Sequence, residues 1–286
     1  MSRSIILAHI DEQDDGTATG IWDPYVLKSA FQPIFILGHG KLNVVAYEGL
    51  IRPFRDEKSV SPADFFHDIP VADRLNVETL TRTVHLLNAG RFLDPDKMLF
   101  VNFDPSVFHA RQIADMILHE MRVTLNEAGI DPRRVVCEVT EQKSSSQQAL
   151  AVFVEVLRNS GFQVAIDDFG VEASDMERVE MLRPDIVKFD ARWISRLMET
   201  KPGFALLSVM VDEFVSKGIT VIFEGIEESW QLEAAEAAGA HMVQGFLLGR
   251  PELVPGSFAA AFARGDAASV AVPGHPQPTF GRRKTS

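Results

Sequence analysis

The chain of 286 residues contains a single cysteine, Cys137, so it cannot form an internal disulfide bond. The apolar residues around Cys137 predict a buried thiol, which suits a reducing compartment. Basic residues are also scarce, because 28 lysines and arginines stand against 40 acidic residues and leave a formal net charge of -12. This balance excludes the basic surface that non-specific binding to DNA or RNA requires. A local site must therefore hold any anionic ligand.

Long apolar segments are missing as well. The run from Phe204 to Val211 is short and contains Ser208, far below the roughly 18 apolar residues that a membrane-spanning helix needs. The N-terminal sequence MSRSIILAHIDEQDD has too few apolar residues for a secretory signal. We therefore expect a soluble, cytoplasmic protein that does not insert into a membrane.

Short apolar runs alternate with helical patterns along most of the chain. Eight runs read as strands: FQPIFIL from residue 31, NVVAYEGLI from 43, MLFVNF from 98, RVVCEVTE from 134, FQVAIDDFG from 162, DIVKFD from 185, TVIFEGIE from 220 and HMVQGFLL from 241. Apolar residues recur at helical spacing over 77–87, 113–125, 150–157 and 204–214. Gly161, Gly218 and Gly239 stand where left-handed helix caps are expected. This alternation predicts an α/β protein, and its size matches a closed (β/α)8 barrel of the TIM type, although a doubly wound open sheet predicts much the same local pattern.

Polar side chains stand at the C-terminal ends of the predicted strands. They are Glu48, Asn102, Glu138, Asp167, Asp168, Lys188, Glu224 and Gln244. In a closed barrel these strand ends surround one opening, so the eight side chains would meet there. A single acid at a strand end is more often a helix cap or a surface ion pair, and only the joint pattern favours a functional site.

So many carboxylates in one place need compensating positive charge, since burying them unpaired costs several kcal/mol each. Lys188 and the nearby Arg52 are too few cations, so the pattern indicates divalent metal ions. Because the available ligands are all oxygens, Mg²⁺ or Mn²⁺ is favoured. Asp167 and Asp168 alternate in direction along a strand, so one could bridge two ions while the other holds the second. Two-metal chemistry on a phosphate ester would follow, with the Arg52 guanidinium binding phosphate.

Several strings now point to one family. They are FQPI at 31, YEGLIR at 47, VNF at 101, EVTE at 138, IDDFG at 166, VKFD at 187, FEGIE at 223 and QGFLLGRP at 244. Together they resemble the EAL-domain family of cyclic di-GMP phosphodiesterases over roughly residues 28–255. The resemblance implies a modified barrel whose first strand runs opposite to the rest, and hydrolysis of cyclic di-GMP to linear pGpG. With the polar ends of the chain it predicts three parts: a partly flexible lead-in at 1–27, an EAL-type barrel domain at 28–264 and a disordered tail at 265–286.

The resemblance also implies roles for individual residues. Its metal ligands are, for one ion, Glu48, Asn102, Glu138 and Asp167, and, for a second ion, Asp167, Asp168 and Glu224. Lys188 would contact the attacking water, with Gln244 near that water and with Glu48 and Glu224 sharing in catalysis. Arg52 would contact a phosphate oxygen, Gln32 would face a guanine, and Glu141 would anchor the loop after the paired aspartates. A homodimer is expected by family habit, and regulatory input is expected to arrive through the N-terminal lead, the tail, a dimer partner or another protein.

Two segments depart from the family pattern. Gly49 stands where the family has alanine, and residues 171–175 read VEASD where the family has a Thr-Gly-Tyr-Ser-Ser type of sequence. The altered loop keeps a second hypothesis open, in which the chain is a receptor that binds cyclic di-GMP without cleaving it. A third hypothesis, independent of the family, is another barrel enzyme with a carboxylate pair, such as a glycosidase or a metal-assisted lyase.

Overall fold

The computed structural model describes residues 6–38, 41–104, 111–139, 147–171, 176–258 and 270–271. Its barrel strands are β3 (Tyr25–Gly38), β4 (Lys41–Arg55), β6 (Met98–Phe103), β7 (Val135–Val139), β8 (Gln163–Phe169), β9 (Ile186–Phe189), β10 (Thr220–Phe223) and β11 (Met242–Val243). Each overlaps one of the eight runs that the sequence predicts as strands. All eight predicted strands are therefore confirmed, although only Met242–Val243 of the last run is strand.

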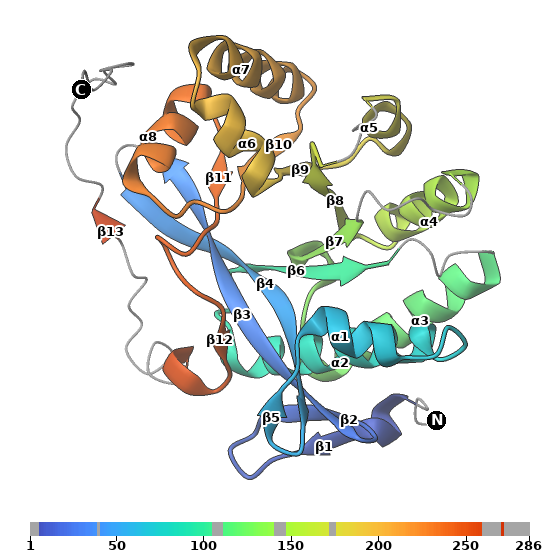
Figure 1. Cartoon of the computed structure of the whole chain (residues 1–286). Coiled ribbons are helices and arrows are strands. Elements are labelled where there is room, and N and C mark those ends of the chain that lie inside the picture. Colours follow the sequence, from blue (N-terminus) through green and yellow to red (C-terminus); the bar gives the residue numbers. More distant parts are fainter. Residues whose placement is uncertain are drawn as a thin grey trace.

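The eight strands close into a ring (Figure 1). Their order is β3-β11-β10-β9-β8-β7-β6-β4, and β4 pairs back with β3. β3 runs antiparallel to both of its neighbours, β4 and β11. The other pairings within the ring are parallel. The TIM-like barrel with one antiparallel strand is confirmed, and the open doubly wound sheet is excluded.

Helices cover the outside of the barrel (Figure 1). They are α2 (Arg74–Phe92), α3 (Arg111–Ala128), α4 (Gln147–Asn159), α5 (Met176–Leu182), α6 (Ala191–Met198), α7 (Lys201–Ser216) and α8 (Ser229–Ala238), with a short helix η3 (Pro132–Arg134) before β7. The amphipathic segments predict α2, α3, α4 and α7, whereas α5, α6 and α8 are too short for a clear period. Gly161, Gly218 and Gly239 have φ angles of 91°, 75° and 84°, so the predicted left-handed caps are confirmed.

Alternate residues of the strands enter two different cores. The barrel interior holds one buried apolar side chain from each of seven strands: Ile34, Ala46, Phe100, Val136, Ala165, Ile186 and Ile222. Their neighbours along the chain point the other way and pack beneath the helices, as Cys137 and Val187 do. Cys137 therefore faces away from the barrel interior, as the sequence predicts.

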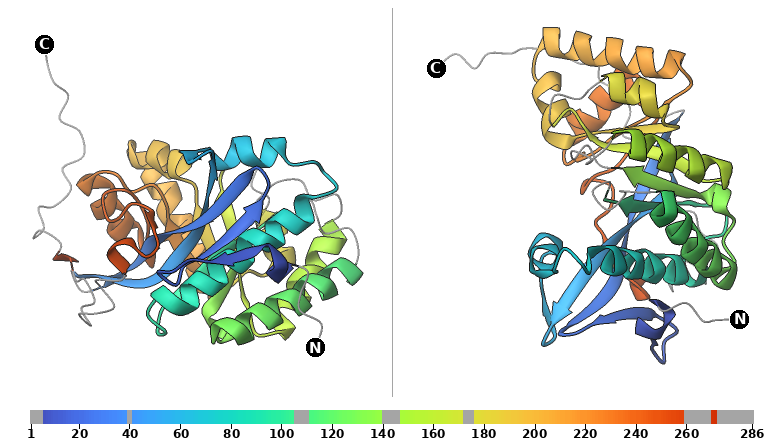
Figure 2. Two further views of the ribbon diagram at one scale, coloured as in Figure 1. Left: turned by 90° about the horizontal axis from the view of Figure 1, so that it is seen from below. Right: turned by 90° about the vertical axis from the view of Figure 1, so that its right-hand side faces the viewer.

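The N-terminal residues extend the sheet beyond the barrel. A short helix η1 (Ile6–His9) leads into β1 (Ile10–Glu12) and β2 (Ala18–Trp22), which pair antiparallel with each other and with β3. With β5 (Lys58–Ser59) and α1 (Pro62–Asp68) they gather around one end of the long β3–β4 ribbon (Figure 2). A separate apolar cluster there includes Tyr25, Phe65 and Leu80. Residues 10–12 and 18–22 of the predicted lead-in are thus part of the sheet, while the proposed boundaries at 27 and 264 stay a prediction.

Two short strands complete the described residues. β12 (Glu252–Leu253) pairs with β3, and β13 (Val270–Ala271) pairs with Leu42 and Lys41 of β4. The rest of the predicted tail lies outside the described residues. Of the helices in the described ranges, none combines the length and apolar character that crossing a membrane requires.

Candidate functional site

Strand periodicity places the predicted site residues in one layer. Six of them lie two positions beyond a residue of the barrel interior, as Glu48 does after Ala46 and Lys188 does after Ile186. The same offset holds for Asn102, Glu138, Asp167 and Glu224. Since successive side chains alternate between the two faces of a strand, these residues form the next layer toward the C-terminal opening. Gln32 lies two positions before Ile34 because β3 runs the opposite way, and it pairs directly with Glu48.

Lys188 is the centre of this layer. Its Nζ lies 2.6 Å from Glu138 Oε1, 2.6 Å from Glu224 Oε1, 3.1 Å from Asp167 Oδ1 and 3.7 Å from Glu48 Oε2. The side chain is fully buried, with 1% exposure. One ammonium group therefore bridges carboxylates from β4, β7, β8 and the residue after β10. We call Glu48, Glu138, Asp167, Asp168 and Glu224 the carboxylate cluster.

The charges of the cluster shift the protonation of its members. Burial raises the pKa of Glu138 well above its ordinary value, and neighbouring Glu48 and Asp167 add to the shift although Lys188 opposes it. Burial raises the pKa of Glu224 to about 8, again against the pull of Lys188. Burial alone would lower the pKa of Lys188, but the surrounding carboxylates outweigh it and raise that pKa well above normal. One ammonium is thus too little positive charge for this many acids.

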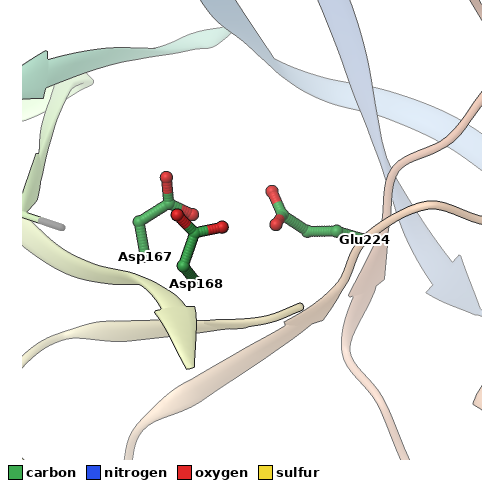
Figure 3. Close-up of side chains that lie close together, drawn as sticks. All are labelled: Asp167, Asp168 and Glu224. Carbon is green, nitrogen blue, oxygen red and sulfur yellow. The ribbon is translucent and has the colours of Figure 1, made fainter. Parts of the chain in front are cut away.

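A β-bulge brings Asp168 to the same opening as Asp167. The register between β8 and β9 shifts between Ile166 and Phe169, and Asp168 has a φ angle of 57°, in the left-handed region. Carboxylate oxygens of Asp167, Asp168 and Glu224 lie within 4.8 Å of one another. Figure 3 shows both aspartates from β8 facing Glu224. The expectation that the two aspartates alternate in direction, as in a regular strand, is therefore wrong, because the bulge turns both side chains toward the cluster.

Orphaned polar atoms show that the cluster suits a cation. Gln244 Nε2 donates a hydrogen bond of 2.7 Å to Glu48 Oε2, while Gln244 Oε1 is buried without a hydrogen-bond partner. Both carboxylate oxygens of Glu138 and Oδ1 of Asp167 are also buried without one, apart from the ion pairs to Lys188. Buried acceptors without donors cost free energy unless a cation fills the gap. An all-oxygen donor set of this kind fits Mg²⁺ or Mn²⁺.

The remaining predicted residues lie at the edge of the cluster. Arg52 is half-buried on β4 and donates from Nη1 to the carbonyl of Ile51 at 2.9 Å. Gln32 donates from Nε2 to the carbonyl of Gly249 at 3.1 Å. Asn102 is exposed at the end of β6. Glu141 lies outside the described residues, as do residues 172–175 of the altered loop.

A cavity of about 530 Å³ adjoins the cluster at Arg52 and Asn102. Leu50, Ile51 and Phe66 form an apolar part of its lining. The helix α2 contributes charged side chains, which include Glu78 and Arg82. The opening of the barrel therefore continues into a space large enough for part of an organic ligand.

The polar face of α2 is a feature that the sequence analysis missed. Glu78, Arg82 and His85 are buried there, and all three line the cavity. Arg82 Nη1 lies 3.4 Å from Glu78 Oε2 and 3.4 Å from the carbonyl oxygen of Asn102, and its guanidinium lies over the ring of Phe103. Burial, with Arg52 and Arg82 nearby, lowers the pKa of His85 to about 3, so the ring is neutral. The run ETLTRTVH at 78–85 carries these polar residues among apolar ones, and that mixture was the available signal.

Comparison with protein families assigns the barrel. The EAL domain model matches residues 26–251. The chain belongs to the EAL-domain family. The family's characteristic name motif is represented here by Glu48, Gly49 and Leu50, at the point where β4 enters the cluster.

Relatives and solved structures agree with this assignment. The chain is 27% identical over 228 residues to YkuI, an uncharacterized EAL-domain protein of Bacillus subtilis, covering 77% of this chain and 54% of that protein. It is 29% identical over 225 residues to PdeB, a probable cyclic di-GMP phosphodiesterase of Escherichia coli, covering 76% of this chain and 41% of the relative. The structure resembles the manganese and cyclic di-GMP complex of Klebsiella pneumoniae BlrP1, with a TM-score of 0.70, 26% identity and coverage of 86% and 59% of the two chains. It also resembles YkuI with cyclic di-GMP and calcium, with a TM-score of 0.67, 25% identity and coverage of 83% and 60%. The chain thus spans about half or less of the curated relatives described here.

Proposed function

We propose that the chain hydrolyses cyclic di-GMP to linear pGpG in a reaction that depends on Mg²⁺ or Mn²⁺. The observation that carries the proposal is the convergence of acids from β4, β7, β8 and β10 around Lys188, with buried oxygens left without donors. The named relative PdeB and the cyclic di-GMP complexes of BlrP1 and YkuI support the choice of substrate.

The metal ligands are those that the resemblance to the EAL-domain family implies, and the oxygen donors of the cluster fit them. Glu48, Asn102, Glu138 and Asp167 would hold one ion, and Asp167, Asp168 and Glu224 would hold the other. When bound, the ions would supply Lewis-acid stabilisation of the charge that develops on the phosphate. The carboxylates would be deprotonated in that state, because a bound cation favours their charged form.

The other polar residues would act on the substrate and on water. Lys188 would donate a hydrogen bond to the attacking water and position it next to the carboxylate cluster. Gln244 would orient the same water or Glu48. Arg52 would bind a phosphate oxygen with its guanidinium, and Gln32 would face one guanine. The cavity beside Arg52 offers space for one nucleoside half of the substrate.

Incubation of the purified chain with cyclic di-GMP tests the proposal. Linear pGpG should form with Mg²⁺ or Mn²⁺, and it should stop forming when a chelator removes the metal. Absence of pGpG with either metal would contradict the proposal. In that case binding of cyclic di-GMP, measured by calorimetry, would favour a receptor, which the VEASD sequence at 171–175 keeps open as the second candidate. The expected homodimer and any regulatory protein stay predictions.

A further inference from the structure

Gly49 makes an unusually close contact with α2. A Cβ atom added to Gly49 would lie 3.0 Å from Cγ of His85 and 3.2 Å from its Cβ and Cδ2. The φ angle of Gly49 is not in the left-handed region, so the backbone conformation does not demand glycine at this position. A side chain at this position would instead require the His85 ring to move by a few tenths of an ångström. This contact stands directly beside Glu48 in the sequence and in the strand.

His85 is held in place by a chain of buried hydrogen bonds. Its Nδ1 lies 2.9 Å from Ser29 Oγ on β3. Asn88 Nδ2 donates to Ser29 Oγ at 3.1 Å and to the carbonyl of Ala18 at 2.8 Å, and Asn88 Oδ1 accepts from Ala18 N at 2.8 Å. Ser29, His85 and Asn88 are each at most 4% exposed. The chain ties α2 to β2 and β3.

The hydrogen count of this chain favours one tautomer of the ring. Both amide hydrogens of Asn88 are used, one by Ala18 and one by Ser29. The buried hydroxyl hydrogen of Ser29 then has His85 Nδ1 as its acceptor, and the neutral ring carries its own hydrogen on Nε2. In the other tautomer the buried hydroxyl hydrogen of Ser29 would lose His85 Nδ1 as its acceptor, at a cost in free energy. The ring is therefore a rigid support against β4.

We propose that His85 is a positioning residue for Glu48, and that Gly49 provides the space in which the His85 ring packs against β4. The ring sets how closely β4 approaches α2, and so sets where the carboxylate of Glu48 stands relative to Lys188 and Gln244. This inference rests on the proposed function in that Glu48 is taken as a metal ligand. Residues that orient a metal ligand without touching the metal change metal affinity by about 10-fold to 100-fold when they are substituted.

A double substitution tests the contact. Gly49→Ala should weaken Mn²⁺ binding about tenfold because the new methyl group displaces the ring. His85→Ala should weaken it by a similar factor because the support is lost. In Gly49→Ala/His85→Ala the methyl group takes part of the space that the ring leaves, so the affinity should return to within about threefold of the original protein. Titration calorimetry with Mn²⁺ on metal-free protein measures the affinity of the original protein and of the three variants. Equal affinities in all four proteins would overturn the proposal.

Gly20→Ala is the matched control. A Cβ on Gly20 of β2 would lie 3.0 Å from Val84 Cγ2 and 3.1 Å from Leu80 Cγ, so it presses on the same helix from a strand that carries no cluster residue. It should lower the free energy of unfolding while leaving the Mn²⁺ affinity unchanged. If Gly20→Ala weakens Mn²⁺ binding as much as Gly49→Ala does, the effect is a general displacement of α2 and the proposal is wrong.

A gentler variant covers the case in which His85→Ala does not fold. Ser29→Ala removes the partner of Nδ1 but keeps the ring against Gly49, and it should reduce Mn²⁺ affinity by a smaller factor of about three. An unchanged affinity in this variant together with folded, fully active Gly49→Ala would also overturn the proposal. Failure of the proposed function can be told apart from failure of this inference. A protein that binds Mn²⁺ but yields no pGpG still allows the Mn²⁺ affinities of the original protein and its variants to be compared.

Discussion

Gln244 and Glu48, 196 residues apart in the chain, share a buried hydrogen bond of 2.7 Å from Nε2 to Oε2. The same oxygen of Glu48 lies 3.7 Å from Lys188 Nζ. Gln244 thus orients an acid of the cluster from the position directly after β11, the strand that closes the barrel by pairing with the antiparallel β3.

Gln244→Ala should lower the rate of cyclic di-GMP cleavage at saturating substrate by about 10-fold to 100-fold. A hydrogen bond to a charged group contributes about 1.5–3 kcal/mol, which corresponds to that range. Initial rates in excess Mn²⁺ measure the effect. Gln163→Ala is the control, because Gln163 begins β8 at the opposite end of the barrel and its amide donates to the carbonyl of Arg133. A similar loss in both variants would contradict a specific role for Gln244.

Lys188→Met should destabilise the metal-free protein by about 3–5 kcal/mol, because it leaves several buried carboxylates without their cation. Urea unfolding near neutral pH, with a chelator present, measures the change in the free energy of unfolding. Lys217→Met removes an ammonium that pairs with Glu213 and Glu180 at the surface, and it should cost less than about 1 kcal/mol. Saturating Mn²⁺ should shrink the loss in Lys188→Met. A loss no larger than that of Lys217→Met would show that Lys188 does not neutralise the cluster.

The metal-free protein should lose stability as the pH rises from about 4.5 to about 8. Glu224 has a raised pKa of about 8 in the folded state, so the folded protein holds a proton that the unfolded chain releases in this window. The raised pKa of Glu224 contributes its full stabilisation below the pKa that this glutamate has in the unfolded chain. The stabilisation is lost as the pH rises to the pKa of the folded state, by at most about 1.4 kcal/mol per pH unit. The free energy of unfolding, measured at several pH values across this range, should depend less on pH in Glu224→Gln than in the original protein. The exposed Glu236 of α8 provides the control substitution, and a slope that Glu224→Gln leaves unchanged would contradict the assignment.

Asp168→Ala and Asn102→Ala should each remove one of the two proposed ions. Asp168 is assigned to one ion and Asn102 to the other, while Asp167 is shared between them. Calorimetric titration with Mn²⁺ should give a stoichiometry near two for the original protein and near one for each variant. Asp167→Ala should weaken both binding events. If Asp168→Ala and Asn102→Ala both keep two ions of unchanged affinity, the ligand assignment fails.

The sequence could predict the layer of site residues because β6 to β10 are short apolar strands with a polar residue at or next to their C-terminal ends. Lys188 and Glu138 follow directly from the two-residue period of β9 and β7, once the barrel is closed. Asp168 could not be placed in this way, since its orientation depends on a bulge and a left-handed backbone that the period does not contain. The contact of His85 with Gly49 joins a helix to a strand 36 positions away, and local patterns do not report such packing.

The N-terminal hairpin was hidden for a related reason. Residues 11–20 are acidic and contain two glycines, so their composition resembles a loop. Thr17 and Ala18 are nevertheless buried, because β2 pairs with the long β3 and Asn88 of α2 bonds the backbone of Ala18. Pairing with an existing strand stabilises such a segment without strong β propensity of its own.

Anomalous scattering from a crystal grown with Mn²⁺ and cyclic di-GMP tests the central claim most directly. The account predicts two manganese peaks within bonding distance of the carboxylate cluster, with Asp167 between them and a phosphate of the nucleotide beside Arg52. A crystal that shows the nucleotide at the barrel opening but no manganese at Glu48, Glu138, Asp167, Asp168 or Glu224 would contradict it.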